Sequence, residues 1–443
     1  MKAMNQSADK SIIPKIAEAV LGQLGLSPAK DDKMNTDFRA NGVLTLGAEL
    51  ELQIVDAESC ALTSRAEDLL KPFKPDVKIK PELYMDMIEL VTGICGDANE
   101  VESDLSTTMD LLVAEGEKIG VGFSSTGSHP FSRYASSDVY PAERYNDLID
   151  RNQWLTRRWK VYGLHVHIGM ESGDECIRFN NFFMRLLPHL LALSSSAPFW
   201  QGEDTGLATC RPTMYEALPT AGLPYFVQSW SEFTALCETL RKAKAITSLK
   251  DLWWDVRPSP SFGTLEIRVC DSPATLAETV AIVAFIHSLA HWFKDHGDWL
   301  SQVPQPQHWL MRENKWRVIR HGMDADVVMN AEGDNQAIRG DILGWIEKIE
   351  PYAMKLGYVG HMDVLHGICA KGSSSARQRS VFARNQSLRE ACLVNISPTK
   401  YVTAPPKEMK SAASRLKPIN LALIVLNMFS PTSPIPETSL KRR

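Results

Sequence analysis

Three segments of the sequence carry chemically active side chains at every second position. The pairs are Glu49 and Glu51, His165 and His167, and Glu266 and Arg268. Side chains two residues apart lie on the same face of a β-strand, and the residues between these pairs are apolar. Each segment is therefore predicted to be a strand with one apolar and one chemically active face.

A fourth predicted strand, 85–92, places Glu89 between Met87 and Val91. If the strands are neighbours, four glutamates gather, and they cannot all stay ionised unless cations neutralise them. Carboxylates with a few imidazoles favour Mg²⁺, or Mn²⁺, over Zn²⁺. In enzymes, Mg²⁺ commonly bridges nucleotide phosphates. For any single strand, a solvent-exposed sheet face is the favoured explanation, but the recurrence on separate strands favours a site.

The sequence contains no P-loop, GxGxxG or kinase pattern, which are the usual phosphate-binding signatures. Nucleotide binding would therefore depend on metal ions and arginines, because a guanidinium group can hold a phosphate or carboxylate through two hydrogen bonds. The candidate arginines are Arg211, Arg257, Arg268, Arg317 and Arg320.

Helices are predicted between and after these strands. Apolar residues recur at helical spacing over 100–119, 174–196, 275–294, 341–356 and 375–394. Because helices separate the strands, the domain is expected to be α+β or α/β.

The composition is typical of a globular protein: 443 residues, 44% hydrophobic and 23% charged. The net charge of −5 gives no global electrostatic reason to expect nucleic acid or an anionic membrane as a partner.

None of the eight cysteines forms a CxxC pair, which argues against a zinc ribbon or a disulfide scaffold. No signal peptide is evident, and the apolar run 421–429 is too short to span a bilayer. We expect a soluble, cytoplasmic protein.

Three regions are predicted along the chain. Residues 1–40 form a polar extension with a short amphipathic helix over 12–26, and residues 41–396 form the main domain. Residues 397–443 hold seven of the 25 prolines and carry a net charge of +6. Dense proline disfavours helix and sheet, so this tail is expected to be mobile.

Several motifs resemble the type 2 glutamate–cysteine ligase family, whose members are also described as carboxylate–amine ligases. The first three are the runs 47–51, 89–92 together with Glu82, and 163–169. Further matches occur at 127–130, 195–208, 264–271 and 313–317. They run in order over about residues 42–395. Departures are small: the family commonly has an acidic residue where Ala48 or Leu50 stands, and threonine where Ser128 stands.

The resemblance implies a glutamine-synthetase-like catalytic fold of the α+β class, with a largely antiparallel sheet flanked by helices. It also implies ATP-dependent joining of glutamate to cysteine, with ATP and Mg²⁺ (or Mn²⁺) as cofactors. The expected partners are small-molecule substrates, with neither nucleic acid nor membrane. A homo-oligomer is favoured by the resemblance alone.

Roles are assigned as hypotheses. Glu49, Glu51, Glu89 and Glu266 would bind metal, and His167 would assist at metal or phosphate, with His165 the weaker candidate. Arg268 would stabilise the transferring phosphoryl group, and Arg257 and Arg317 would recognise glutamate or phosphate. Four more residues are kept near the site, each with a structural role equally open: His129, Asp204, Arg211 and Trp316.

Three functions are consistent with these residues and with the resemblance. The first is ligation of glutamate to cysteine, and the second is the same chemistry with another acid or amine. The third is a relative that binds nucleotide or amino acid without turnover. Intact glutamates and Arg268 argue against the third.

Overall fold

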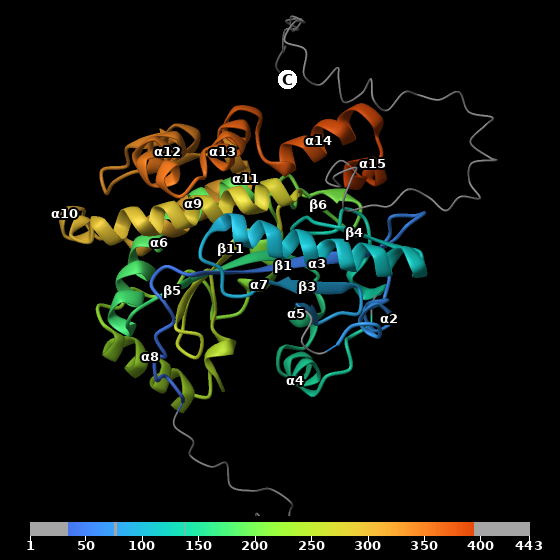
Figure 1. Cartoon of the computed structure of the whole chain (residues 1–443), viewed down its shortest axis with the longest axis horizontal. Coiled ribbons are helices and arrows are strands. Elements are labelled where there is room, and N and C mark those ends of the chain that lie inside the picture. Colours follow the sequence, from blue (N-terminus) through green and yellow to red (C-terminus); the bar gives the residue numbers. More distant parts are fainter. Residues whose placement is uncertain (1–33, 75–77, 137, 394–443) are drawn as a thin grey trace, which may run out of the picture. The chain divides into compact units, whose positions relative to one another are not determined.

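An antiparallel sheet of seven strands contains all four segments predicted to be strands. The computed structural model describes residues 34–74, 78–136 and 138–393, so the predicted helix over 12–26 and the proline-rich tail lie outside the described residues. The strand order is β10-β11-β5-β1-β3-β2, and β4 pairs with β1 (Figure 1). The strands of the sheet are β1 (Leu46–Asp56), β2 (Ile79–Pro81), β3 (Met87–Val91), β4 (Val121–Ser124), β5 (Gly163–Gly169), β10 (Val256–Ser259) and β11 (Thr264–Asp271). Short two-stranded pairs are β6 (Phe199–Trp200) with β7 (Glu203–Asp204), β8 (Ala221–Gly222) with β9 (Trp253–Trp254), and β12 (Asp326–Val328) with β13 (Asn335–Ala337).

Four of the five predicted helices are present with ends shifted by at most three residues. They are α3 (Ala98–Ile119), α6 (Gly173–Ser194), α9 (Leu276–Asp295) and α12 (Ile338–Lys355). The fifth, predicted over 375–394, is two helices, because Gln386 adopts a left-handed conformation with φ 51°. The remaining helices, with these two, are α2 (Ala66–Leu70), α4 (Glu143–Asn152), α5 (Trp154–Arg157), α7 (Arg211–Tyr215), α8 (Trp230–Lys242), α10 (Trp299–Gln302), α11 (His308–His321), α13 (Val359–Lys371), α14 (Ser374–Asn385) and α15 (Leu388–Leu393).

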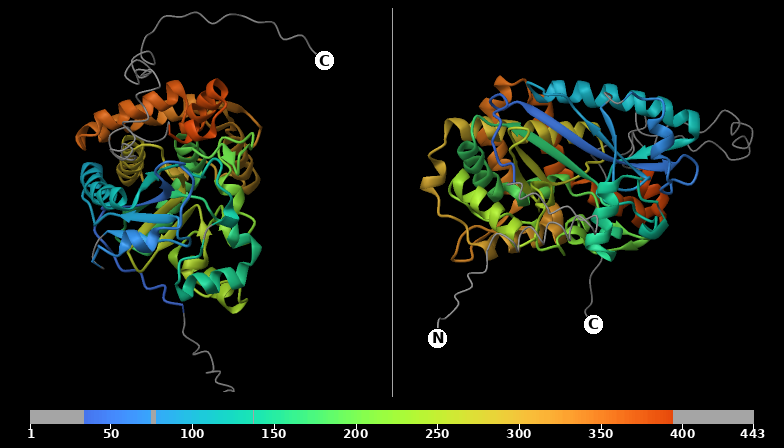
Figure 2. Two further views of the ribbon diagram at one scale, coloured as in Figure 1. Left: turned by 90° about the vertical axis from the view of Figure 1, so that its right-hand side faces the viewer. Right: turned by 90° about the horizontal axis from the view of Figure 1, so that it is seen from below.

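The apolar face of the sheet packs against helices. Leu50 of β1, Val166 of β5 and Ile267 of β11 are fully buried there. Helices α3, α6 and α9 contact this side of the sheet, and α12 and α13 pack over α9 (Figures 1 and 2). The alternation of apolar and polar residues along each strand thus fixes which face the helices cover.

Helix α9 passes through the middle of this helical layer. It is the one helix in the described part of the chain that is long and apolar enough to cross a membrane by composition, with a mean hydropathy of 1.4. However, 89% of the 18-residue window with this hydropathy is buried inside the protein. A helix that is apolar all round is also what a protein core requires, so α9 is explained by its place in the core.

The opposite face of the sheet carries the chemically active residues. The strand register sets Glu49 opposite His165, and Glu266 opposite His167. Between β5 and β11 the register shifts after Ile267, so two residues of β11 oppose one of β5. Such a β-bulge redirects side chains locally, and it lies at the level of Arg268.

Candidate active site

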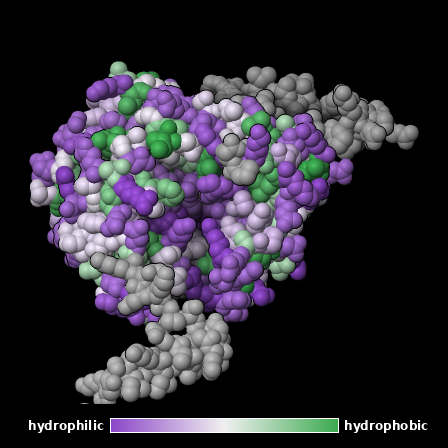
Figure 3. Space-filling model, turned by 60° about the horizontal axis from the view of Figure 1, so that its bottom comes forward, coloured by the Kyte–Doolittle hydropathy of each residue, from purple (hydrophilic) through white to green (hydrophobic). Residues whose placement is uncertain are grey.

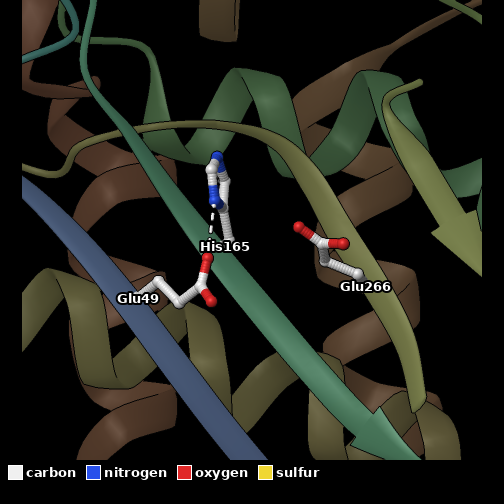
Figure 4. Close-up of side chains that lie close together, drawn as sticks. All are labelled: Glu49, His165 and Glu266. Carbon is white, nitrogen blue, oxygen red and sulfur yellow. Dashed lines mark hydrogen bonds and ion pairs between the residues drawn. The ribbon is translucent and has the colours of Figure 1, made fainter. Parts of the chain in front are cut away.

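Three neighbouring strands bring Glu49, His165 and Glu266 together (Figure 4). The residues come from β1, β5 and β11, and β5 lies between the other two strands. One possible ligand atom from each side chain lies within 4.8 Å of the others. His165 Nδ1 is 3.1 Å from Glu49 Oε2. These side chains form a group with the ligand chemistry of a metal site.

A second group consists of Glu51, Glu89 and His165, within the same distance. Glu51 and Glu89 lie directly opposite each other on β1 and β3, where like charges destabilise a sheet. Burial and the charge of Glu82 raise the pKa of Glu51 to about 7. Burial and three neighbouring glutamates raise the pKa of Glu89 well above its ordinary value. Near neutral pH, this group therefore holds protons or requires a cation.

Two guanidinium groups hold Glu266, one at each carboxylate oxygen. Arg257 donates two hydrogen bonds to Oε2, at 3.0 and 2.7 Å, and Arg268 pairs with Oε1. Burial would raise the pKa of Glu266, but the two arginines hold it below its usual range. Both guanidinium groups line the same cavity, where they could also donate hydrogen bonds to a phosphate group.

The two histidines differ in their surroundings. His165 belongs to both groups, and burial with the charge of Arg268 lowers its pKa to about 4, so its ring is neutral at pH 7. His167 Nδ1 lies 2.9 Å from the Thr264 hydroxyl. Its buried Nε2 is 3.4 Å from Glu49 Oε1 and makes no hydrogen bond within the described chain. The sequence favours His167, whereas the structure gives His165 the more central position.

Both groups face a cavity of about 670 Å³. The sheet forms its floor, and its walls come from α4, residues 247–250 and the turn between β10 and β11. Figure 3 shows hydrophilic side chains around a hollow in the face toward the viewer. Aromatic residues complete the walls: Tyr145, Trp159, Tyr215, Trp253, Trp254 and Phe262. A concave site with a few convergent polar groups and aromatic walls is typical of small-molecule binding.

Eight of the nine residues predicted for the site line this cavity: Glu49, Glu51, Glu89, His165, His167, Arg257, Glu266 and Arg268. The exception is Arg317 on α11. Its guanidinium pairs with Glu313 one helical turn away, at 2.8 Å, and donates to the Asp326 carbonyl at 3.1 Å. The structure therefore does not bring Arg317 to the other predicted residues.

Of the four residues kept near the site, Arg211 lines the cavity and the others do not. His129 is buried with its Nε2 2.9 Å from a backbone carbonyl, and Asp204 accepts hydrogen bonds from Arg379. Trp316 is 49% exposed on α11. These contacts give His129 and Asp204 structural roles.

Four charged residues of the cavity are missing from the predicted set: Lys80, Glu82, Arg144 and Lys250. Lys80 lies opposite Glu89 on β2, and burial raises the pKa of Glu82. Glu82 has a sequence signal, because it belongs to the motifs that carry the family resemblance. Lys80 stands in a strand of three residues and Arg144 in an ordinary surface helix, so neither position has a local pattern that marks it.

The donor set fits a hard divalent cation. Carboxylate oxygens outnumber imidazole nitrogens, and no cysteine lines the cavity in the described part of the chain. The raised pKa values of Glu51 and Glu89, and a buried His167 Nε2 that makes no hydrogen bond within the described chain, are what ligands of a cation would show when it is not bound. These observations favour Mg²⁺ or Mn²⁺ over Zn²⁺.

Solved structures share this architecture. The glutamate–cysteine ligase from Francisella tularensis in complex with AMP superimposes with a TM-score of 0.59 at 12% identity, covering 90% of this chain and 97% of that one. A bifunctional glutathione synthetase from Pasteurella multocida gives a TM-score of 0.58 at 15% identity, covering 80% of this chain and 51% of that one. At these identities the likeness concerns the fold alone. The predicted α+β, glutamine-synthetase-like class is confirmed.

Proteins found by sequence comparison are more similar to this chain than these solved structures are. The sequence model of glutamate–cysteine ligase family 2 matches residues 45–393. A protein of Bdellovibrio bacteriovorus named "Putative glutamate--cysteine ligase 2" is 39% identical over 352 residues, or 79% of this chain and 93% of the relative. A protein of Thermobifida fusca with the same name is 37% identical over 363 residues, or 81% of this chain and 91% of the relative. The chain belongs to glutamate–cysteine ligase family 2, and its class is that of a ligase acting on small molecules.

Proposed function

We propose that this protein joins the γ-carboxylate of glutamate to the amine of cysteine, with ATP converted to ADP and phosphate. The observation that carries the proposal is the convergence on one cavity of four predicted glutamates (Glu49, Glu51, Glu89 and Glu266) with Arg257 and Arg268. Family membership implies ATP and a divalent cation in general terms. Mg²⁺ as the cation, and glutamate and cysteine as the substrates, are part of the proposal.

The proposed chemistry overcomes a poor leaving group. A free carboxylate would have to expel oxide, whereas a γ-glutamyl phosphate expels phosphate. The γ-phosphoryl group of ATP passes to the glutamate carboxylate. The amine nitrogen of cysteine then attacks the acyl carbon, the carbon–oxygen bond to phosphate breaks, and the amine loses a proton. Such phosphoryl transfer depends mainly on positioning and charge neutralisation.

The residues of this chain divide these tasks. Glu49, Glu51 and Glu89 would hold the cations, which supply charge neutralisation to phosphate oxygens when bound. Glu266 fixes Arg257 and Arg268, as their hydrogen bonds indicate, and would complete the ligand set of the cations. The two guanidinium groups would bind the phosphate oxygens and stabilise the charge that develops on them. The aromatic walls offer apolar surface around the reacting groups.

A second candidate keeps the chemistry and changes the amine. The cavity walls contain the aromatic side chains of Tyr145, Trp159 and Trp253, and the rings of the two tryptophans contact each other with centroids 4.3 Å apart. They offer apolar surface that a larger acceptor could bury. The experiment that tests the function therefore varies the amine acceptor.

The experiment measures phosphate release from ATP and Mg²⁺ with glutamate fixed, across a panel of amines. The panel contains cysteine, other amino acids and aromatic amines. Release that requires glutamate and is fastest with cysteine, with the dipeptide confirmed by mass, supports the first function. Faster release with another amine supports the second. Folded protein that binds ATP and releases no phosphate with any pair would contradict both.

The variant Glu266→Gln tests the centre of the site. It removes the charge that holds Arg257 and Arg268 and keeps the shape of the side chain. We expect turnover to fall by about a hundredfold or more, as when one oriented charge is removed from a catalytic site. Phosphate release by the variant measures this, and thermal unfolding verifies that it folds. Turnover within about threefold of the wild type would remove Glu266 from the mechanism.

Two further measurements separate the two roles of Glu266, which are metal binding and positioning of the arginines. If Glu266 binds metal, Mn²⁺ affinity of the variant falls together with turnover. If Glu266 only fixes the arginines, turnover falls and Mn²⁺ affinity is retained. Glu332→Gln, at an exposed position between β12 and β13, is the matched control and should change neither.

A further inference from the structure

A second cavity lies among the helices that cover the apolar face of the sheet. Its volume is about 590 Å³, and it shares no lining residue with the cavity of the candidate active site. Its walls come from α6, α10, α11, α12, β12 and the segments 303–307 and 329–331. A cavity of this size accommodates an organic molecule of moderate size.

The walls of this second cavity are mainly apolar. Trp299, Leu310, Met311, Val327 and Trp345 all contribute. Trp299 and Trp345 contact each other edge to face, with ring centroids 5.8 Å apart. Aromatic and aliphatic side chains of this kind contact the apolar body of a ligand.

The charged groups of the wall are mostly positive. Arg185, on α6, has a buried Nε with no hydrogen-bond partner in the described chain, and no described residue forms an ion pair with it. Its guanidinium carbon lies 5.6 Å from the Trp299 ring centroid. Lys348 contributes a second cation, 4.3 Å from the Trp345 ring centroid. A half-buried guanidinium with no anionic partner is costly unless an anion joins it.

The single carboxylate of the wall is already engaged. Asp341 Oδ2 lies 2.6 Å from His189 Nε2. His189 is 6% exposed, and its Nδ1 has no hydrogen-bond partner within the described residues. Asp341 therefore does not neutralise Arg185, and His189 presents a second unsatisfied polar atom at the same cavity.

We propose that this cavity binds an organic anion, with Arg185 holding the acid group and Trp299, Leu310 and Trp345 contacting an aromatic or aliphatic body. The ligand class is a carboxylate or sulfonate on an apolar body. The charge of the wall selects an anion over a neutral molecule of the same shape. This site is separate from the proposed ligase reaction and does not depend on it.

Two dyes of one skeleton test the proposal on the full chain. 8-Anilinonaphthalene-1-sulfonate carries an acid group, and N-phenyl-1-naphthylamine lacks it. Both fluoresce when an apolar site binds them, so fluorescence titration measures both affinities. We expect one saturable site per chain that binds the sulfonate about tenfold more tightly, because charge-assisted hydrogen bonds stabilise it.

Gly344 provides a blocking variant. It lines the cavity from α12, and a Cβ added there meets no atom within 4 Å. The backbone at this position therefore admits a side chain, and Gly344→Leu should obstruct the cavity and abolish binding of both dyes. Gly340→Leu is the matched control, because Gly340 lies one turn earlier in the same helix and does not line the cavity.

Arg185 provides the charge test. Arg185→Met should weaken sulfonate binding by about tenfold and leave the neutral dye within about twofold, and Arg185→Lys should restore part of the difference. Thermal unfolding of each variant verifies folding. Unchanged sulfonate binding in Gly344→Leu would place the dye elsewhere and overturn the proposal. Equal affinities for the two dyes, unaffected by Arg185→Met, would also overturn it.

Discussion

At the scale of single residues, one glycine explains how the floor of the candidate site accommodates an arginine. Gly163 donates its backbone N–H to Glu51. A Cβ at this position would lie closer to the Arg211 guanidinium than real contacts allow. Arg211 cannot give way easily, because its guanidinium donates to the backbone carbonyls of Val269, at 3.3 Å, and Arg268, at 3.2 Å. Gly163 thus permits an arginine to pack on the strand beside Glu51.

We predict that Gly163→Ala displaces Arg211 and lowers ligase turnover by about tenfold, while the fold is retained. The free energy of unfolding should fall by about 1–3 kcal/mol, which is the usual cost of overpacking a buried position. Phosphate release and urea unfolding measure the two effects. Gly360→Ala is the control, because an added Cβ there meets no atom within 4 Å and the position lies in α13. Unaltered turnover in Gly163→Ala would show that Arg211 tolerates displacement.

At the scale of elements, the break between α14 and α15 shows how one backbone conformation overrides a helical pattern. The apolar spacing continues across the break, yet Gln386 has φ 51° and ends α14. Left-handed conformations cost about 1–2 kcal/mol for residues with a side chain. Glycine adopts them without that cost, so it is the residue preferred at such a position.

We therefore predict that Gln386→Gly raises the free energy of unfolding by about 0.5–1 kcal/mol, the net of relieved strain and the greater chain entropy of glycine. Gln386→Val should lower it, because a β-branched side chain is the least tolerant of this conformation. Urea denaturation measures both. Ala383→Gly, inside α14, controls for the general effect of glycine and should destabilise by about 1 kcal/mol. A loss of stability in Gln386→Gly would contradict the explanation.

At the scale of the whole molecule, buried histidines link stability to pH. Burial lowers the pKa of His129 and of His287 to about 4, and the two residues lie in different parts of the fold. The unfolded chain binds a proton at each with a pKa of about 6.5. The stabilisation from keeping them neutral is therefore complete above pH 6.5 and is lost as the pH falls from 6.5 toward 4.

His129 allows a clean measurement. Its Nδ1 accepts a hydrogen bond from the Ser132 backbone N–H at 3.0 Å, which a protonated ring cannot do. Between pH 7 and pH 5 we expect the wild type to lose about 2 kcal/mol of unfolding free energy through this residue. His129→Gln should be less stable at pH 7 but lose correspondingly less on acidification. Urea unfolding at both pH values measures this, and an identical pH dependence in the variant would exclude His129 as the source.

Much of the site could be predicted from the sequence, because alternation along a strand is a local property. The period of two puts Glu49 with Glu51, and Glu266 with Arg268, on one face whatever the neighbouring strands are. The apolar residues between them in turn identify the buried face. The class of cation follows from the ligand types alone.

Only the tertiary structure decided which of these faces meet. Strand β5 lies between β1 and β11, so His165 rather than His167 is shared by both groups of glutamates. Lys80 lines the cavity because the short strand β2 pairs with β3, and Arg144 lines it because α4 packs beside the sheet. Arg317 does not line the cavity, and it forms an ion pair with Glu313 on its own helix. The physical reason is the same throughout. Strand order, register and helix packing are set by contacts between residues far apart in the chain, which local periodicity does not encode.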